Sequence, residues 1–120
     1  MKKKEIIFSI VFSLMTLLLF FVFKPTERKI CMKAYSEAMK MQYKGIVKAR
    51  FIDNRNHLAP TIIVVSGHDS ITITDYRDKS GLFEYLEKGD SIKKINNSPI
   101  VIVKRNGTNL SFTITYNCPD

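Results

Sequence analysis

Residues Ile6–Phe23 read IIFSIVFSLMTLLLFFVF and contain no charged side chain. As an α-helix rising 1.5 Å per residue, this run would extend about 27 Å, close to the hydrocarbon thickness of a bilayer. Its only polar side chains are hydroxyls, which hydrogen-bond back to their own helix and are therefore tolerated in lipid. The run predicts a transmembrane helix over residues 6–23, preceded by a basic tail over residues 1–5.

A cleaved secretory signal is the main alternative for this run, with Lys2–Lys4 as its basic region. Signal sequences usually hold only about 7–15 apolar residues and end in small residues before the cleavage site. Here the run ends in the bulky residues Phe20–Phe23 and continues with Lys24. We therefore expect a retained anchor with a single span.

The orientation of the anchor follows from its flanks and from the cysteines. Lysine and arginine residues are about equally numerous on the two sides of the run, so the excess of positive charge expected on the cytoplasmic side does not decide the orientation. A short tail with three lysines crosses a membrane less readily, and Cys31 and Cys118 flank the remaining chain as a pair, which suits an oxidising compartment. We expect the N-terminus inside and the domain outside the cytoplasmic membrane.

The remaining chain is long enough for one compact domain, since the whole sequence has 120 residues, and its formal net charge is +8. A basic balance is compatible with nucleic acid, anionic lipid or an acidic partner. Aromatic residues do not alternate with the basic ones as stacking on nucleic acid requires. We therefore expect no nucleic-acid binding.

A juxtamembrane amphipathic helix is predicted over residues 24–44. Small and apolar residues such as Cys31 and Ala38 fall on one arc, and Gly45 is expected to cap the helix. The opposite arc carries a basic stripe that could face anionic lipid, with a solvated helix face as the alternative. The stripe consists of Lys29, Lys33, Lys40 and Lys44.

Residues 45–120 are predicted to form a small β-rich domain. Apolar and polar residues alternate in several short segments, and Asn106-Gly107 has the residues of a tight turn between two strands. The fold class is therefore α+β, with an antiparallel sheet or barrel of about five to six strands. The expected core consists of Phe51, Ile63, Val65, Ile71, Ile73, Val101, Val103, Phe112 and Ile114.

The two cysteines are candidates for a disulfide. Cys31 lies on the apolar arc of the predicted helix and Cys118 on the inward face of the last predicted strand, so helix-on-sheet packing would bring them together. The bond would close a loop of about 87 residues and contribute on the order of 4 kcal/mol. The alternative is two unlinked small apolar side chains.

Other reactive residues form no convincing site. Ser91 and Lys94 have the Ser-x-x-Lys spacing of acyl-enzymes, but we expect a strand here, in which residues three apart point to opposite faces and the lysines are exposed. His57 and His68 lie in predicted turns without zinc-site spacing. We expect no catalytic residue, no metal site, no cofactor and no small-molecule substrate.

The segment Gly81–Lys94, GLFEYLEKGDSIKK, together with the lysine-led anchor and the juxtamembrane helix, resembles a group of small uncharacterised single-pass bacterial envelope proteins. The resemblance implies a bacterial inner membrane with the domain on the periplasmic side, and it supplies no activity. The main functional hypothesis is a non-enzymatic anchored domain that binds or scaffolds another envelope protein. The alternatives are a small envelope hydrolase and a basic sensor of anionic lipid.

Overall fold

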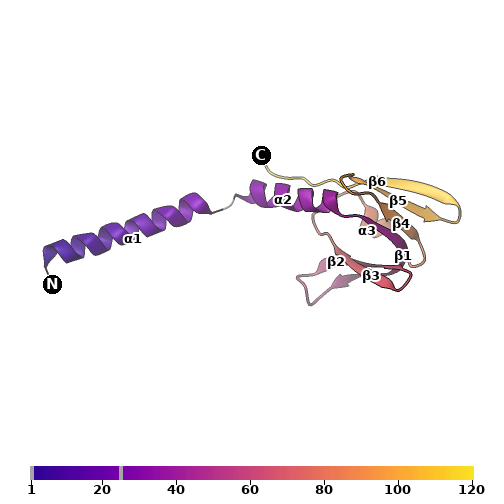
Figure 1. Cartoon of the computed structure of the whole chain (residues 1–120), viewed down its shortest axis with the longest axis horizontal. Helices are drawn as coiled ribbons and strands as arrows, with labels where there is room; N and C mark the ends of the chain where they lie inside the picture. Colours follow the sequence, from indigo (N-terminus) through magenta and orange to yellow (C-terminus); the bar gives the residue numbers. More distant parts are fainter. Residues whose placement is uncertain (1, 25) are drawn as a thin grey trace.

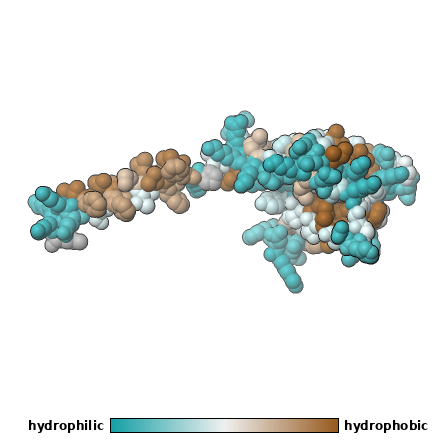
Figure 2. Space-filling model, viewed as in Figure 1, coloured by the Kyte–Doolittle hydropathy of each residue, from teal (hydrophilic) through white to brown (hydrophobic). Residues whose placement is uncertain are grey.

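The computed structural model describes residues 2–24 and 26–120. Helix α1 (Lys3–Phe23) extends away from the folded domain and shows apolar side chains along most of its length (Figures 1 and 2). It is long and apolar enough to cross a membrane, and none of its residues is buried against protein. A secretory signal would meet the same criterion of length and composition.

Helix α2 (Glu27–Lys40) begins where the Thr26 hydroxyl accepts a hydrogen bond from the Lys29 amide at 3.3 Å. It ends four residues before the predicted boundary, so the expectation that Gly45 caps this helix is wrong. Gly45 lies instead in strand β1 (Tyr43–Asp53), where an added Cβ would collide with the Val65 carbonyl oxygen of the neighbouring strand. The glycine is needed because the backbones approach closely, and not because a helix stops.

Six strands form one antiparallel sheet in the order β3-β2-β1-β4-β5-β6. The start of β1 pairs with β4, and its remainder pairs with β2 through a bulge between Val47 and Ala49. Strand β1 therefore joins the two halves of the sheet. The other strands are β2 (Ala59–Ser66), β3 (Asp69–Thr74), β4 (Ser91–Lys94), β5 (Ile100–Arg105) and β6 (Thr108–Thr113).

The predicted α+β class is confirmed, but the sheet is open and the barrel alternative is wrong. The edge strands β3 and β6 are not paired with each other; beyond their ends, one isolated bridge joins Asp78 to Tyr116. The connection from β3 to β4 includes helix α3 (Leu82–Tyr85), and its Leu82 and Leu86 are buried in the core. This connection fills the inner side of the bent sheet, which keeps the two edges apart.

The core lies on the inner face of the sheet, and the prediction of its members is partly correct. Ile73, Val101, Val103 and Ile114 are buried, and Phe112 is half-buried against the core.

In β2 the predicted face is wrong, since Ile62 and Val64 are buried in place of Ile63 and Val65. This strand is apolar on both faces, so alternation cannot select the inner one.

Phe51 and Ile71 are also exposed, contrary to the prediction. For Phe51 the cause is the bulge in β1. It adds one residue between Val47, which is buried, and Phe51, so that Phe51 projects from the outer face. Ile71 lies opposite Val64 on the inner face, but β3 is an edge strand and leaves it partly uncovered.

We predict that Ile92→Ala lowers the free energy of unfolding by about 2–5 kcal/mol, because Ile92 is fully buried and its truncation leaves a cavity. The matched control is Ile102→Ala on the neighbouring strand, where the side chain is exposed and the expected loss is below about 1 kcal/mol. Urea unfolding of the detergent-solubilised chain measures both. Equal losses would show that the inner and outer faces are assigned wrongly.

Candidate functional site

A disulfide joins Cys31 of α2 to Cys118 near the C-terminus, with the two Cα atoms 5.6 Å apart. This confirms the predicted pairing, and the described part of the chain contains no free cysteine. The C-terminal segment consequently runs back along α2 (Figure 1). Since α2 follows α1 after three residues, the bond ties the C-terminal segment to the element that is next to α1 in the chain.

Asp75, just after β3, links the C-terminal segment to the sheet, whereas the disulfide links this segment to α2. The Tyr116 hydroxyl donates a hydrogen bond to Asp75 Oδ1 at 2.6 Å, and the Tyr116 ring packs edge-on against Tyr35 of α2, with centroids 5.3 Å apart. Burial raises the pKa of Asp75, although the hydrogen bond from Tyr116 acts in the opposite direction. The sequence analysis missed this carboxylate, which has no motif around it.

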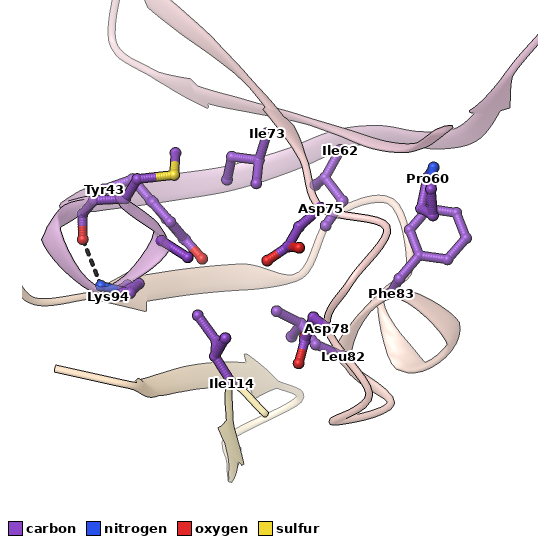
Figure 3. Close-up of a pocket in the computed structure, with 12 residues that line it drawn as sticks. Tyr43, Pro60, Ile62, Ile73, Asp75, Asp78, Leu82, Phe83, Lys94 and Ile114 are labelled. Atoms are coloured by element: carbon purple, nitrogen blue, oxygen red, sulfur yellow. Dashed lines mark hydrogen bonds between the residues drawn. The ribbon is translucent and has the colours of Figure 1, made fainter. Parts of the chain in front are cut away.

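A small cavity adjoins Asp75 on the inner side of the sheet (Figure 3). Its volume is about 30 Å³, enough for one or two water molecules and too little for an organic substrate. The Tyr43 hydroxyl points into it toward the Asp75 carboxylate, and burial raises the pKa of Tyr43 (Figure 3). The remaining wall is mostly apolar.

Asp90, at the turn before β4, is 3% exposed and forms a two-pronged ion pair with Arg105 at the end of β5. Arg105 Nε donates to Asp90 Oδ1 and Arg105 Nη2 to Asp90 Oδ2, both at 2.7 Å. These bonds hold the pKa of the Asp90 carboxyl below its usual value. The Arg105 guanidinium also lies over the Tyr85 ring, 4.3 Å from its centroid. The ion pair fixes the β3–β4 connection on the sheet.

Lys94 is 1% exposed, which contradicts the expectation that the lysines of this strand face solvent. Its ammonium donates three hydrogen bonds, to the carbonyl oxygens of Met39 at 2.7 Å, Met41 at 2.6 Å and Ile95 at 3.2 Å. Two of these acceptors lie at the C-terminal end of α2, where the helix dipole favours a cation. Burial lowers the pKa of Lys94. The side chain therefore fastens α2 to the centre of the sheet.

The expected separation of Ser91 from Lys94 is confirmed. Ser91 pairs with Lys104 on the outer face, whereas Lys94 pairs with Val101 on the inner face, so no Ser–Lys pair forms. His57 lies in the β1–β2 connection and His68 in the turn before β3. Within residues 2–24 and 26–120, no three His, Cys, Asp or Glu side chains are grouped closely enough to hold a metal ion.

The predicted basic stripe is divided between two elements. Lys29, Lys33 and Lys40 are exposed on α2, but Lys44 lies in β1, opposite Lys93 of β4. The stripe on the helix is therefore one residue shorter than expected. Lys44 belongs to a different surface, on the sheet.

That surface is the outer face of the sheet, which neither α2 nor α3 covers. Ile46 lies opposite Val65, and Ala49 opposite Ile63, so apolar side chains form a continuous row on β1 and β2. Ile46 is 49% exposed, and Ile102 on β5 is 39% exposed.

Cations lie among these apolar positions on β1, β4 and β5. Lys44, Lys93 and Lys104 project from the outer face, because each lies opposite another residue of that face. Among the strand residues of this face that the structure describes, Asp53 at the far end of β1 is the only acidic one. The sequence analysis missed this surface because it assigned Ile63 and Val65 to the core.

Comparisons with protein-family models, with curated proteins and with solved structures give no match for this chain. The buried polar groups Asp75, Asp90 and Lys94 are all engaged in holding the fold together. The outer face combines exposed apolar side chains, Ile46 and Ile102, with lysines beside them, a combination that is found on surfaces that bind other macromolecules.

We predict that Lys94→Met lowers the free energy of unfolding by about 1–3 kcal/mol, because it leaves carbonyl oxygens at the end of α2 without a donor. Lys93→Met is the matched control on the same strand, where the exposed side chain should contribute less than about 0.5 kcal/mol. Chemical unfolding of both variants in detergent measures the difference. A neutral Lys94→Met variant would show that the carbonyls find other donors.

We predict that the Asp75→Asn variant has a flatter dependence of stability on pH than the wild type. The folded-state pKa of Asp75 lies above its unfolded value, so the folded state binds the proton more tightly. This group therefore lowers the free energy of unfolding as pH rises from about 4 through the folded pKa. Asparagine keeps an acceptor for the Tyr116 hydroxyl and removes the titration.

The difference in unfolding free energy between the two proteins, measured at about pH 7 and about pH 5, tests this sign. Wild type should gain stability relative to Asp75→Asn as the pH falls. A difference that stays constant with pH would mean that Asp75 titrates alike in the folded and unfolded chains.

Proposed function

We propose that this protein is a membrane-anchored, non-enzymatic envelope domain whose outer face binds another envelope protein. The observation that carries the proposal is the apolar row on β1 and β2, in which Ile46 is exposed and Ala49, Ile63 and Val65 are partly exposed. Contiguous exposed apolar surface is uncommon on soluble monomeric domains and typically marks an interaction site. In this proposal the partner is a protein of the compartment in which the Cys31–Cys118 disulfide forms.

The charge beside the apolar row specifies the chemistry of the partner. Lys44, Lys93 and Lys104 carry charges of one sign, and Asp53 at the end of β1 is the one acidic strand residue described on this face. Like charges across an interface are strongly unfavourable, so the matching surface carries carboxylates beside an apolar patch. We therefore infer an acidic partner surface.

The connection to the anchor supports a role that depends on position. Helix α2 follows α1 after three residues and is fastened to the domain by the Cys31–Cys118 disulfide and by the Lys94 ammonium. The outer face is therefore held near the membrane, and α1 confines the domain to that surface. In this proposal α1 is a retained anchor in the bacterial inner membrane, and the domain lies on the periplasmic side.

Site-specific photo-crosslinking in native membranes tests the proposal. A photoreactive residue at Ile46 or Ile102 should give an adduct with one partner protein, whereas the same residue at Leu110 should not. Leu110 is a matched control because it is also exposed but lies opposite Val103, on the inner face of the sheet. Adducts of equal yield at Ile46 and Leu110, or none at Ile46 and Ile102, would contradict the proposal.

Charge reversal provides the second measurement. Lys93→Glu should reduce the yield of the Ile46 adduct at least about tenfold, the effect of about 1.4 kcal/mol. Lys88→Glu, which reverses an exposed lysine in the loop before β4, should leave the yield unchanged. An equal response to both reversals would indicate that net charge matters and that the position of the lysines on the outer face does not.

A further inference from the structure

The connection between β1 and β2 presents a second exposed surface, here called the hairpin tip and defined as residues 50–58. Phe51, Ile52 and Leu58 expose apolar side chains there, and Leu58 is 64% exposed. Its cationic side chains are Arg55, in the turn, and Arg50, which lies opposite Ile62 on the inner face with its guanidinium 5.3 Å from the Phe83 ring centroid. Apolar and cationic residues side by side are typical of surfaces that settle into the headgroup region of a bilayer.

The backbone of the hairpin tip is held in an unusual conformation. His57 and Leu58 both have positive φ angles, of 51° and 58°, a region that costs free energy for residues other than glycine. The turn is nevertheless ordered by hydrogen bonds, since the Asn56 amide donates to the Asp53 carbonyl and the Ala59 amide to the Asn56 carbonyl. The fold thus holds a leucine in a strained conformation with its side chain pointing into solvent.

The single carboxylate of the hairpin tip does not cancel its charge. Asp53 accepts a hydrogen bond from the Arg55 amide at 3.0 Å, which leaves the Arg55 guanidinium unpaired among the described residues. The tip therefore carries a net positive charge beside exposed apolar groups. An anionic surface with an apolar interior would satisfy both features.

The position of the hairpin tip in the domain indicates which anionic surface it could contact. The tip lies on the side of the domain from which α2 starts, and the turn between β5 and β6 lies at the opposite end (Figure 1). Helix α2 begins four positions after Phe23, a distance of at most about 14 Å along the chain, so this side would face the membrane that α1 would cross.

We propose that the hairpin tip docks on the anionic headgroups of the bilayer in which α1 is embedded, as a second point of membrane contact. Arg55 would bind a lipid phosphate, and Leu58 would enter the interface. Two contacts, at α1 and at the tip, would fix the tilt of the domain. This inference stands independently of the partner proposed for the outer face.

The absence of tryptophan from this chain allows a direct test with a single reporter. Leu58→Trp is introduced into the full chain and reconstituted in vesicles of phosphatidylglycerol and phosphatidylcholine, with brominated lipid in both leaflets. Leu110→Trp is the matched control, because Leu110 is an equally apolar and exposed residue in β6, whose hairpin turn with β5 lies at the opposite end of the domain (Figure 1). Phe51→Trp serves as a second reporter if the first variant folds poorly.

We expect the brominated lipid to quench the tryptophan of Leu58→Trp at least twofold more than that of Leu110→Trp. The excess should disappear in vesicles of phosphatidylcholine alone, and Arg55→Ser should reduce it. Equal quenching of Leu58→Trp and Leu110→Trp would overturn the proposal. Quenching that persists without anionic lipid would overturn the assignment to anionic headgroups, and a blue-shifted emission without quenching would assign the tip to contact with another copy of the chain.

Discussion

The structure depends on the way in which β1 is shared between the two halves of the sheet. Its first residues pair with β4 and its later residues with β2, so each half is completed only through this strand. The close approach of Gly45 to the Val65 carbonyl oxygen allows the β1–β2 pairing, since any side chain there would separate the backbones. The bulge after Val47 then exchanges the two faces of the strand, which places Phe51 outside. Both proposed binding surfaces follow from these two local features.

Two buried charges complete the arrangement around β4. Asp90 before the strand binds Arg105, and Lys94 at its end binds the carbonyls that terminate α2. A buried charge is costly unless it is fully hydrogen-bonded, so each of these groups restricts its neighbours to one geometry. In the segment Gly81–Lys94, two charged residues, Asp90 and Lys94, are therefore part of the packing of the fold.

The same contacts connect the domain to its anchor. The Cys31–Cys118 disulfide, the Tyr35–Tyr116 ring contact and the Lys94 ammonium all join α2 to the sheet or to the C-terminal segment. A helix held at three places is fixed to the domain as one rigid element. The outer face and the hairpin tip would then occupy a defined distance from the bilayer, which suits a domain that works by presenting a surface.

The sequence by itself determined the features that depend on local pattern or on chain length. Four features follow from residues close together in the chain: the apolar run of α1, the amphipathic α2, the turn at Asn106-Gly107 and the α+β class. The pairing of Cys31 with Cys118 follows from the inward-facing positions of the two cysteines. Tertiary structure decided which face of β2 is buried. Thr61–Ser66 is apolar on both faces, so the alternation of apolar and polar residues does not indicate which face is the inner one. It also decided that Lys94 is buried and that the sheet stays open. Lys94 is buried where carbonyl oxygens distant in the sequence, those of Met39 and Met41, converge on its ammonium, and the open sheet depends on how six strands pair over the whole domain.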